Sequence, residues 1–226
     1  MTRYAVIVAG GSGSRYGGPV PKQFLSLAGV PVLMRSVELF AGCGARIIVV
    51  LPEAQTGYWA DLCRERSFGV EHQVVTGGGS RFESVKNALA AIDALPGDIV
   101  AVHDGVRPLV PPEVIEDAYA TAARRGSAVP VVPVTDSIRR TDGHGGSRAV
   151  PRERLVAVQT PQAFDAVALK QAYEAEFSPL FTDDASVMEA SGRGVTLIAG
   201  SPGNIKITHP GDIAIAELIL RNGTPR

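Results

Sequence analysis

Residues 4–24 read YAVIVAGGSGSRYGGPVPKQF, an apolar run followed directly by a glycine-rich loop. The run from Tyr4 to Ala9 is continuous rather than alternating, which predicts a fully buried strand. The loop after it carries two basic residues, Arg15 and Lys22. Glycine lets the backbone come close to a ligand, and the N–H groups of such a loop can form a nest for anions. The arrangement therefore favours a polyphosphate ligand.

Two better-known phosphate-binding motifs are excluded for this loop. A dinucleotide fingerprint needs G-x-G-x-x-G, and Tyr16 stands where the third glycine should be. A Walker A loop needs Lys and then Ser or Thr after its last glycine, but Pro19 and Val20 follow Gly18. Glycine-rich turns that bind nothing also follow first strands, so from the glycines alone that alternative stays open. If the loop binds phosphate, the expected backbone contacts are at Ala9, Gly10, Gly11 and Gly13.

The composition is ordinary for a soluble globular protein. Of 226 residues, 45% are hydrophobic and 20% are charged, and the length suits one compact α/β domain. The formal net charge of −1 offers no broad basic field for nucleic acid, so local basic residues indicate a small anionic ligand. The first apolar run is too short for a signal peptide or a membrane span, and Cys43 and Cys63 are interpreted as free thiols. We expect a cytoplasmic protein without membrane attachment.

Apolar runs alternate with helical patterns along the rest of the chain. Further strands are expected at 45–51, 70–76, 99–103, 127–134, 155–159 (stopped by Thr160-Pro161-Gln162) and 194–199. Helices are expected at 32–40, 53–66, 81–95 after a capping box of Ser80 and Glu83, 113–125, 165–177, 184–190 and 211–220. Because the strands are solid apolar runs, the predicted fold class is α/β, with a mostly parallel central sheet and helices on both faces.

Three loops follow the carboxyl ends of predicted strands, where ligands of parallel sheets bind: 10–22, 77–80 and 103–108. Asp104 ends a buried strand. As an exposed carboxylate it could hold Mg²⁺ together with substrate phosphates, or it could merely cap a turn. Arg107 could clamp a phosphate, or pair with Asp104 and hold the turn.

Other candidate residues are less distinctive in the sequence. Gly78 allows a base or sugar to approach, and Ser84 offers a hydroxyl, although a solvent-facing helix position explains Ser84 equally well. His103 is expected to be a packed core residue without a role. Three residues come from separate segments of the chain and would have a functional role only if they met at a common site: Arg152, Thr182 and Lys206.

Residues 135–151, TDSIRRTDGHGGSRAVP, interrupt the α/β pattern. The segment is polar and glycine-rich, so it cannot bury a core of its own. It is either a flexible surface loop or a protruding hairpin arm, with DGHGG as its turn, that docks on a second subunit.

The sequence lacks the motifs of common hydrolases, G-x-S-x-G, H-E-x-x-H and C-x-x-C. The chemistry that it favours is charge neutralisation around phosphates. A phosphate monoester is largely dianionic at neutral pH, since its second pKa is about 6, so it needs no general base to attack phosphorus. Cations need only align it and stabilise a departing pyrophosphate.

Six motifs, in this order and spacing, resemble those of the 2-C-methyl-D-erythritol 4-phosphate cytidylyltransferases: AGGSGSRYGGPVPKQF, GGGSRFESVKNAL, VHDGVRP, QTPQAF, FTDDAS and NIKIT. The likeness covers essentially the whole chain. It implies a single Rossmann-like nucleotidyltransferase domain over residues 1–226, with a protruding β-arm at about 135–151, and a homodimer. It also implies transfer of a cytidylyl group from CTP to methylerythritol phosphate, by in-line attack of the acceptor phosphate on the α-phosphorus, with Mg²⁺.

The resemblance further implies roles for individual residues. Arg15 and Lys22 would be catalytic and grip the CTP phosphates, and Asp104 would bind the metal and the nucleotide. The backbone at Gly78 and the hydroxyl of Ser84 would form the cytosine pocket. Six residues would bind the acceptor, and Arg152 and Lys206 among them would also be catalytic: Arg107, Asp136, Ser137, Arg152, Thr182 and Lys206. The arm would lend part of this site to the neighbouring subunit.

Two departures from the family pattern keep an alternative acceptor open. The first strand ends VAGG, where many members read PAAG, and Gly79 stands where several members are acidic. The AGG form also occurs in ribitol-5-phosphate cytidylyltransferases, whereas FTDDAS followed by VMEA favours the erythritol branch. Outside this class, a dinucleotide-dependent oxidoreductase and a non-catalytic nucleotide-sensing module remain alternatives.

Overall fold

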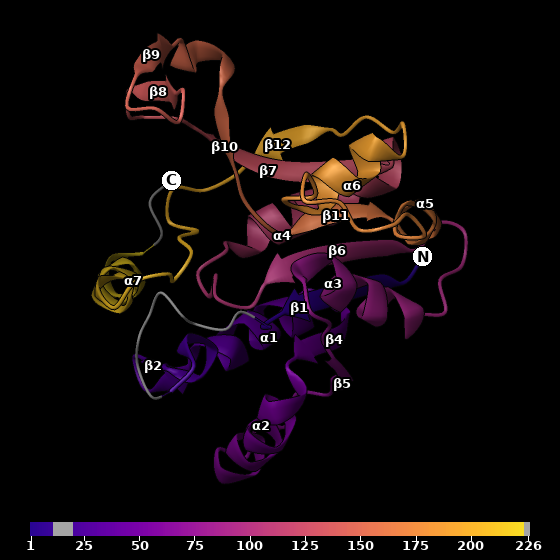
Figure 1. Ribbon diagram of the computed structural model, residues 1–226. Helices are drawn as coiled ribbons and strands as arrows, with labels where there is room; N and C mark the ends of the chain where they lie inside the picture. The colour runs from indigo at the N-terminus through magenta and orange to yellow at the C-terminus, as the bar shows by residue number, and fades with distance from the viewer. Residues whose placement is uncertain (11–19, 224–226) are drawn as a thin grey trace.

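The computed structural model describes residues 1–10 and 20–223. Its centre is an eight-stranded sheet in the order β10-β7-β11-β6-β1-β4-β5, with β12 paired to β7 (Figure 1). The strands of this sheet are β1 Arg3–Val8, β4 Arg46–Leu51, β5 Gln73–Thr76, β6 Ile99–Asp104, β7 Ser127–Pro133, β10 Val156–Val158, β11 Gln162–Asp165 and β12 Leu197–Ala199. Strand β1 pairs in parallel with both β4 and β6, and β4 with β5. The expected mostly parallel sheet is confirmed.

The central parallel strands β1, β4 and β6 are buried on both faces, as their continuous apolar sequences predict, whereas the edge strand β5 is largely exposed. In β1, Ala5, Val6 and Ile7 are all fully buried although successive side chains point to opposite faces. The chain moves outward from β1 through β4 to β5, and then returns to β6 on the other side of β1. This reversal creates a topological switch point at the carboxyl ends of β1 and β6, where open α/β sheets bind their ligands.

Strand β11 was not expected, because Thr160-Pro161-Gln162 was interpreted as a strand stop. Gln162–Asp165 instead forms a buried strand that is antiparallel to β6 and β7. The side chain of Gln162 can be buried there because its amide donates to Asp183 and its oxygen accepts from the N–H of Ala185. These four residues form a strand because they pair with two neighbouring strands and because the buried Gln162 side chain is hydrogen-bonded at both its nitrogen and its oxygen. Neither feature can be read from the four residues themselves.

Helices cover both faces of the sheet, as predicted. They are α1 Val32–Gly42, α2 Glu53–Glu65, α3 Arg81–Ala90, α4 Pro112–Arg125, α5 Ala166–Ala172, α6 Asp184–Ala190 and α7 Gly211–Asn222. On one face, Phe40 of α1, Trp59 of α2 and Tyr119 of α4 belong to one apolar cluster. On the other face, Phe82 of α3 and Tyr173, which follows α5, belong to a second. Within the described residues, no helix is both long and apolar enough for a membrane span.

Two helices end earlier than predicted, and one cap differs from expectation. Helix α3 stops at Ala90 rather than near residue 95, because the chain turns into β6 with the carboxylate of Asp98 accepting from the N–H of Leu95. Helix α5 likewise ends at Ala172 rather than near residue 177. Ser80 is the N-cap of α3, but the carboxylate of Glu83 accepts from the Ser80 hydroxyl instead of completing the reciprocal box.

Residues 135–151 form a hairpin that stands away from the sheet, at the top of the view in Figure 1. The smaller elements are η1 Lys22–Phe24, β2 Ser26–Leu27, β3 Val30–Pro31, β8 Ile138–Thr141, β9 Ser147–Val150 and η2 Arg152–Arg154. At the hairpin turn, Gly143 and Gly145 have positive φ, and the carboxylate of Asp142 accepts from the N–H groups of His144 and Gly146. The expected hairpin with DGHGG as its turn is confirmed.

Candidate active site

A hollow of about 330 Å³ lies at the carboxyl ends of β1 and β6, at the switch point of the sheet; we call it the β1–β6 hollow. Seven of the residues singled out in the sequence line it: Ala9, Gly10, Lys22, Gly78, Ser84, Asp104 and Lys206. Three further candidates, Gly11, Gly13 and Arg15, lie outside the described residues. Folding therefore brings together loops that the sequence separates by up to about two hundred residues, as expected for a parallel sheet.

A second hollow, of about 300 Å³, lies between β6 and the start of α6; we call it the β6–α6 hollow. Arg107 and Thr182 are among the residues that line it. Both hollows are lined by Arg81, Asp104 and Lys206, so they adjoin one another at these side chains. The arrangement provides two neighbouring sites with a shared charged wall.

Asp104 is the electrostatic centre of this wall. Its carboxylate lies 2.9 Å from Nζ of Lys206, 3.3 Å from Nε of Arg107 and 3.8 Å from Nε of Arg81. Burial acts to raise the pKa of Asp104, but the three cations outweigh burial and hold that pKa well below its usual range. Arg81 also pairs with Asp184, so one positive charge remains when the three cations are set against the two carboxylates. Lys22, which lines the β1–β6 hollow beside them, adds a further positive charge, and the wall is therefore suited to anions.

The expectation that Asp104 is an exposed carboxylate was wrong. Only 12% of its side chain is exposed, because the side chains of Lys206, Arg107 and Arg81 surround the carboxylate. The Asp104 N–H donates to the hydroxyl of Thr160, which precedes the missed strand β11, at 3.0 Å.

Arg107 fulfils one of its two alternatives, because it pairs with Asp104 and holds the turn; phosphate binding by Arg107 stays a prediction. Its Nε pairs with Asp104, and its Nη1 donates to the carbonyl oxygen of Asn204 at 2.8 Å. The guanidinium thus holds the turn after β6, and it also lines the β6–α6 hollow. Because Asn204 and Ile207 are fully buried, the backbone on either side of Lys206 is fixed, and its ammonium is delivered to Asp104.

Ser84 is not a solvent-facing helix residue, because it is 4% exposed. Its hydroxyl donates to the carbonyl of Ser80 at 2.8 Å and accepts from the N–H of Gly78 at 3.1 Å. A Cβ on Gly78 would lie 2.3 Å from Cβ of Glu83, so only glycine fits at that position. The serine hydroxyl and the glycine therefore shape the loop that borders the β1–β6 hollow.

His103 is a packed core residue, as expected. It is fully buried, with Nε2 3.1 Å from the carbonyl of Arg107 and Nδ1 3.1 Å from the hydroxyl of Thr160. Burial lowers the pKa of His103 to about 4, so the ring is neutral at neutral pH. Its contacts with Arg107 and Thr160 stabilise the turn that follows Asp104.

Sequence reasoning missed two residues of the site. Gln23 is buried, and its amide donates to the carbonyl of Ala9 at 2.9 Å and to the Gln55 side chain at 2.6 Å, which fixes the residue next to Lys22. Arg81 lines both hollows. A weak signal for Arg81 existed, since it is the basic residue directly after the second glycine-rich loop.

The structure does not bring every predicted residue to these hollows. Asp136, Ser137 and Arg152 are exposed at the base of the hairpin arm and line neither of them. The guanidinium of Arg152 donates to the carbonyl of Thr135. Within one chain, these three residues are thus separate from the charged wall.

The carboxylate of Asp104 offers Mg²⁺ one of its two oxygens, Oδ1. Oδ2 of Asp104 contacts Lys206 and Arg107, whereas the cation nearest to Oδ1 is Arg81, at 3.8 Å. Among residues 1–10 and 20–223, no group of three His, Cys, Asp or Glu side chains could hold a metal. Mg²⁺ in proteins commonly takes one or two carboxylates and completes its shell with substrate phosphates and water. The site therefore fits an ion that arrives with a polyphosphate and takes Oδ1 of Asp104 as a ligand.

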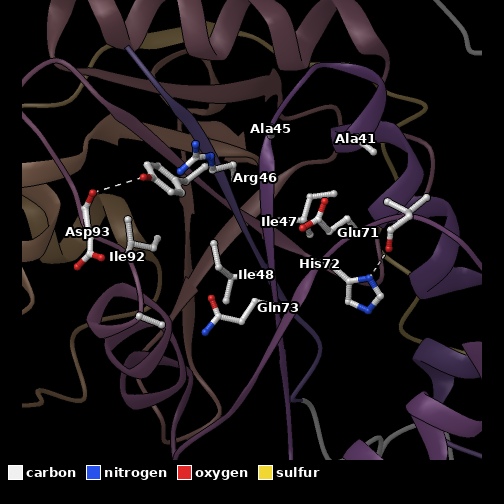
Figure 2. A pocket seen from close by; sticks show the side chains of 13 residues that line it. Ala41, Ala45, Arg46, Ile47, Ile48, Glu71, His72, Gln73, Ile92 and Asp93 are labelled. Carbon is white, nitrogen blue, oxygen red and sulfur yellow. Dashed lines mark hydrogen bonds between the residues drawn. The ribbon is translucent and has the colours of Figure 1, made fainter.

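A larger hollow, of about 780 Å³, opens at the opposite, amino ends of β1, β4 and β5 (Figure 2); we call it the amino-end hollow. Its charged side chains are of both signs, namely Arg46, Glu71 and Asp93. Figure 2 shows two local hydrogen bonds in its wall, from the Tyr4 hydroxyl to the Asp93 carbonyl and between His72 and the Val70 carbonyl. It has neither a glycine-rich loop nor a cluster of like charges in the described residues.

The glycine-rich loop after β1, the switch point and the charged wall define a nucleotide-dependent transferase of the α/β class. The family model of 2-C-methyl-D-erythritol 4-phosphate cytidylyltransferase matches residues 4–222, and the chain belongs to this family. The resemblance found in the sequence is thereby confirmed.

Relatives and solved structures agree with this assignment. A protein of this name from Bacteroides thetaiotaomicron is 50% identical over 223 residues, which cover 97% of this chain and 100% of the relative. One from Phocaeicola vulgatus is 47% identical over 222 residues with the same coverage. The crystal structure of the cytidylyltransferase from Thermus thermophilus matches with a TM-score of 0.78 at 33% identity, over 98% of this chain and 100% of that one. The predicted nucleotidyltransferase fold is confirmed.

Proposed function

We propose that this chain transfers the cytidylyl group of CTP to 2-C-methyl-D-erythritol 4-phosphate, giving 4-diphosphocytidyl-2-C-methyl-D-erythritol and pyrophosphate. The observation that carries the proposal is the wall of Arg81, Arg107 and Lys206 around Asp104, shared by two adjoining hollows. One hollow suits a triphosphate and the other a phosphorylated acceptor, with cations between them. Family membership indicates which two substrates these are.

In this reaction a phosphate oxygen of the acceptor attacks the α-phosphorus of CTP. A P–O bond forms there, the bond from the α-phosphorus to the oxygen that bridges to the β-phosphate breaks, and the electron pair leaves with pyrophosphate. The attacking phosphate is already largely dianionic, with a second pKa of about 6, so no residue has to remove a proton. The chain contributes alignment and charge stabilisation, for which Lys22, Lys206 and, beside the arm, Arg152 are the proposed catalytic groups among the described residues.

The β1–β6 hollow is the proposed nucleotide site. The backbone of Ala9 and Gly10 would approach the nucleotide, and the loop that Ser84 holds at Gly78 would border the cytosine. Arg15, with Gly11 and Gly13, is expected to complete the grip on the triphosphate; these three are proposed from the sequence alone.

Mg²⁺ is the proposed cofactor, and when bound it would neutralise charge on the triphosphate. Asp104 would hold it through Oδ1, because Oδ2 is engaged by Lys206. Asp104→Asn should raise the Mg²⁺ concentration needed for half-maximal pyrophosphate release, and chelation of divalent ions should abolish release by the unchanged chain. Full activity in a chelator would remove Mg²⁺ from the proposal.

The acceptor site is proposed to need two copies of the chain. Arg107, Thr182 and Lys206 line the β6–α6 hollow, whereas Asp136, Ser137 and Arg152 lie on or beside the arm that projects from the sheet (Figure 1). In a homodimer the arm of one copy could supply these three residues to the other copy.

A mixing experiment tests this arrangement. Lys22→Ala and Arg152→Ala chains are each inactive by expectation, but a mixed dimer has one intact site if the arm crosses to its partner. Random exchange should then restore about a quarter of the activity of the unchanged dimer. If Arg152 acts within its own chain, no activity returns, and light scattering that shows a monomer would contradict the dimer itself.

The experiment that decides the function is pyrophosphate release from CTP with each of two acceptors, methylerythritol phosphate and ribitol 5-phosphate. We expect rapid release with the first and little with the second. The reverse preference would make ribitol 5-phosphate the substrate. Tight CTP binding without release from either would indicate a nucleotide-sensing module, and thermal stabilisation by NAD but not by CTP with Mg²⁺ would indicate an oxidoreductase.

We also infer that residues 1–226 act as one nucleotidyltransferase domain in the cytoplasm, with CTP and a polyol phosphate rather than nucleic acid or membrane as partners. The free thiols of Cys43 and Cys63 and the net charge of −1 support this view. Limited proteolysis that released two stable fragments would argue against one domain, and cell fractionation tests the compartment.

A further inference from the structure

Arg81 has a place in the site that the proposed reaction has not used. It is the first residue of α3, and its side chain lines both hollows. Its Nε lies 3.8 Å from Asp104, while its two terminal nitrogens point to a different partner on α6. The residue therefore contacts both sides of the proposed reaction centre.

That partner is Asp184, the first residue of α6, and the ion pair is bidentate. Nη1 of Arg81 lies 3.0 Å from Oδ1 of Asp184, and Nη2 lies 2.6 Å from Oδ2. Asp184 is fully buried and also accepts from the hydroxyl of Tyr173 at 2.6 Å. Burial acts to lower the pKa of Arg81, but the attraction of Asp184 and then of Asp104 outweighs burial. The pKa is therefore raised above its usual range, and the guanidinium stays charged. Lysine cannot reproduce such a planar, two-pronged contact.

The two ends of this ion pair differ in how firmly they are held. The α3 end is fixed independently, because buried Ser84 bonds both Ser80 and Gly78. The α6 end is held by Gln162, which bonds Asp183 and the N–H of Ala185, but it follows a stretch, 174–182, that is mostly exposed and includes Thr182 in the wall of the β6–α6 hollow. Segments with little buried surface open more readily than the core. The ion pair is thus a second anchor at the end of that exposed stretch, and it joins the stretch to the nucleotide side of the site.

We propose that Arg81 is a positioning residue for the acceptor, which ties the start of α6 and the adjacent Thr182 to the nucleotide side of the site through Asp184. The inference rests on the proposed function, since it takes the β6–α6 hollow as the acceptor site. Arg81 acts through Asp184 and Thr182, and it has no assigned contact with either substrate.

The test compares Arg81→Lys with a matched control, Arg3→Lys. Arg3 also makes an ion pair, but through one nitrogen, Nη1, which lies 2.9 and 2.8 Å from the two carboxylate oxygens of Glu116 at the amino end of β1. For Arg81→Lys we expect KM for the acceptor to rise about tenfold while KM for CTP changes less than about threefold. Arg3→Lys should leave both values unchanged. If Arg81→Lys does not fold, the double variant Arg81→Gln/Asp184→Asn, which removes both charges together, takes its place in the same measurements.

Hydrogen exchange of the backbone supplies a readout that does not depend on activity. Residues 178–186 should exchange faster in Arg81→Lys than in the unchanged chain, while residues 81–90 stay protected. Faster exchange together with a raised acceptor KM supports the inference. Faster exchange with an unchanged KM would reduce the ion pair to a structural link, and a raised KM with unchanged exchange would mean that Arg81 contacts substrate directly; either result overturns it. If the unchanged chain uses neither acceptor, the proposed function fails, and the tether itself is then decided by exchange, where unchanged protection overturns it.

Discussion

The hollows at the two ends of the sheet differ in what their charges do. The amino-end hollow is the larger, at about 780 Å³ against about 330 Å³ for the β1–β6 hollow. Its charged groups, Arg46, Glu71 and Asp93, are exposed and of both signs. At the carboxyl end, cations from separate segments converge on one buried carboxylate beside a glycine-rich loop. Volume alone does not make a site; convergence of like charge on a fixed backbone does.

The largest effect that separates the two ends should come from removing one cation at each. Lys22→Ala is expected to lower kcat about 10²- to 10³-fold, the usual loss for one charge-stabilising donor. Arg46→Ala, in the amino-end hollow, should change kcat less than about twofold. Steady-state kinetics on both variants, with circular dichroism to show that they are folded, makes the measurement. Equal losses would place the chemistry at neither hollow in particular.

A smaller effect should follow from adding one methyl group to the loop beside the β1–β6 hollow. Gly78→Ala puts a Cβ 2.3 Å from Cβ of Glu83, so the loop must move, and KM for CTP should rise about tenfold. Gly79→Ala is the matched control, because its Cβ would meet only the flexible end of Glu83, at 3.2 Å. Its KM should rise less than about threefold. Similar values for the two variants would mean that the loop does not border the nucleotide.

Lowering the pH should reduce the free energy of unfolding of the chain through His103. Burial lowers the pKa of His103 to about 4, while an unfolded histidine titrates near about 6.5. Between these values the unfolded chain binds a proton that the folded chain does not, so the free energy of unfolding falls as pH falls through that window, by about 3 kcal/mol. The lowered pKa of Asp104 makes a further loss of stability begin only when the pH falls through about 4, where an unfolded aspartate takes up a proton and the folded one does not.

Urea unfolding between pH 7 and pH 4 measures this slope. His103→Gln should be less stable at pH 7 but should show a flatter dependence on pH than the unchanged chain. An equal slope in both chains would show that His103 does not titrate in this manner.

The smallest expected effect on catalysis lies at the amino end. Trp59 is buried, and its indole N–H donates to Nε2 of His72 at 2.9 Å. His72→Leu leaves that donor without its partner and should lower the free energy of unfolding by about 1–3 kcal/mol. kcat and both KM values should not change. A clear kinetic defect in a folded His72→Leu chain would connect the amino-end hollow to function.

Much of the carboxyl end could be predicted from the sequence because the geometry of parallel sheets is general. Solid apolar runs predicted the strands, and the loops after them had to meet at one edge. Lys206, far along the chain, was joined to Asp104 through the family resemblance, and the structure has the two side chains 2.9 Å apart.

The remainder depends on partners that a linear sequence does not reveal. Arg81 is an ordinary first helical residue until Asp184, 103 positions later, is seen against it. The burial of Asp104 was missed because Arg81 and Lys206, which surround its carboxylate, come from distant segments. Strand β11 was missed because it exists through pairing rather than propensity. Asp136, Ser137 and Arg152 line neither hollow within one chain, and their roles stay predictions.

The most direct test of the account is a crystal structure of the chain with CTP and Mg²⁺ bound. We expect the triphosphate in the β1–β6 hollow between Lys22 and Lys206, with the cytosine at the loop of Gly78 and Ser84. CTP in the amino-end hollow, with the β1–β6 hollow empty, would contradict it.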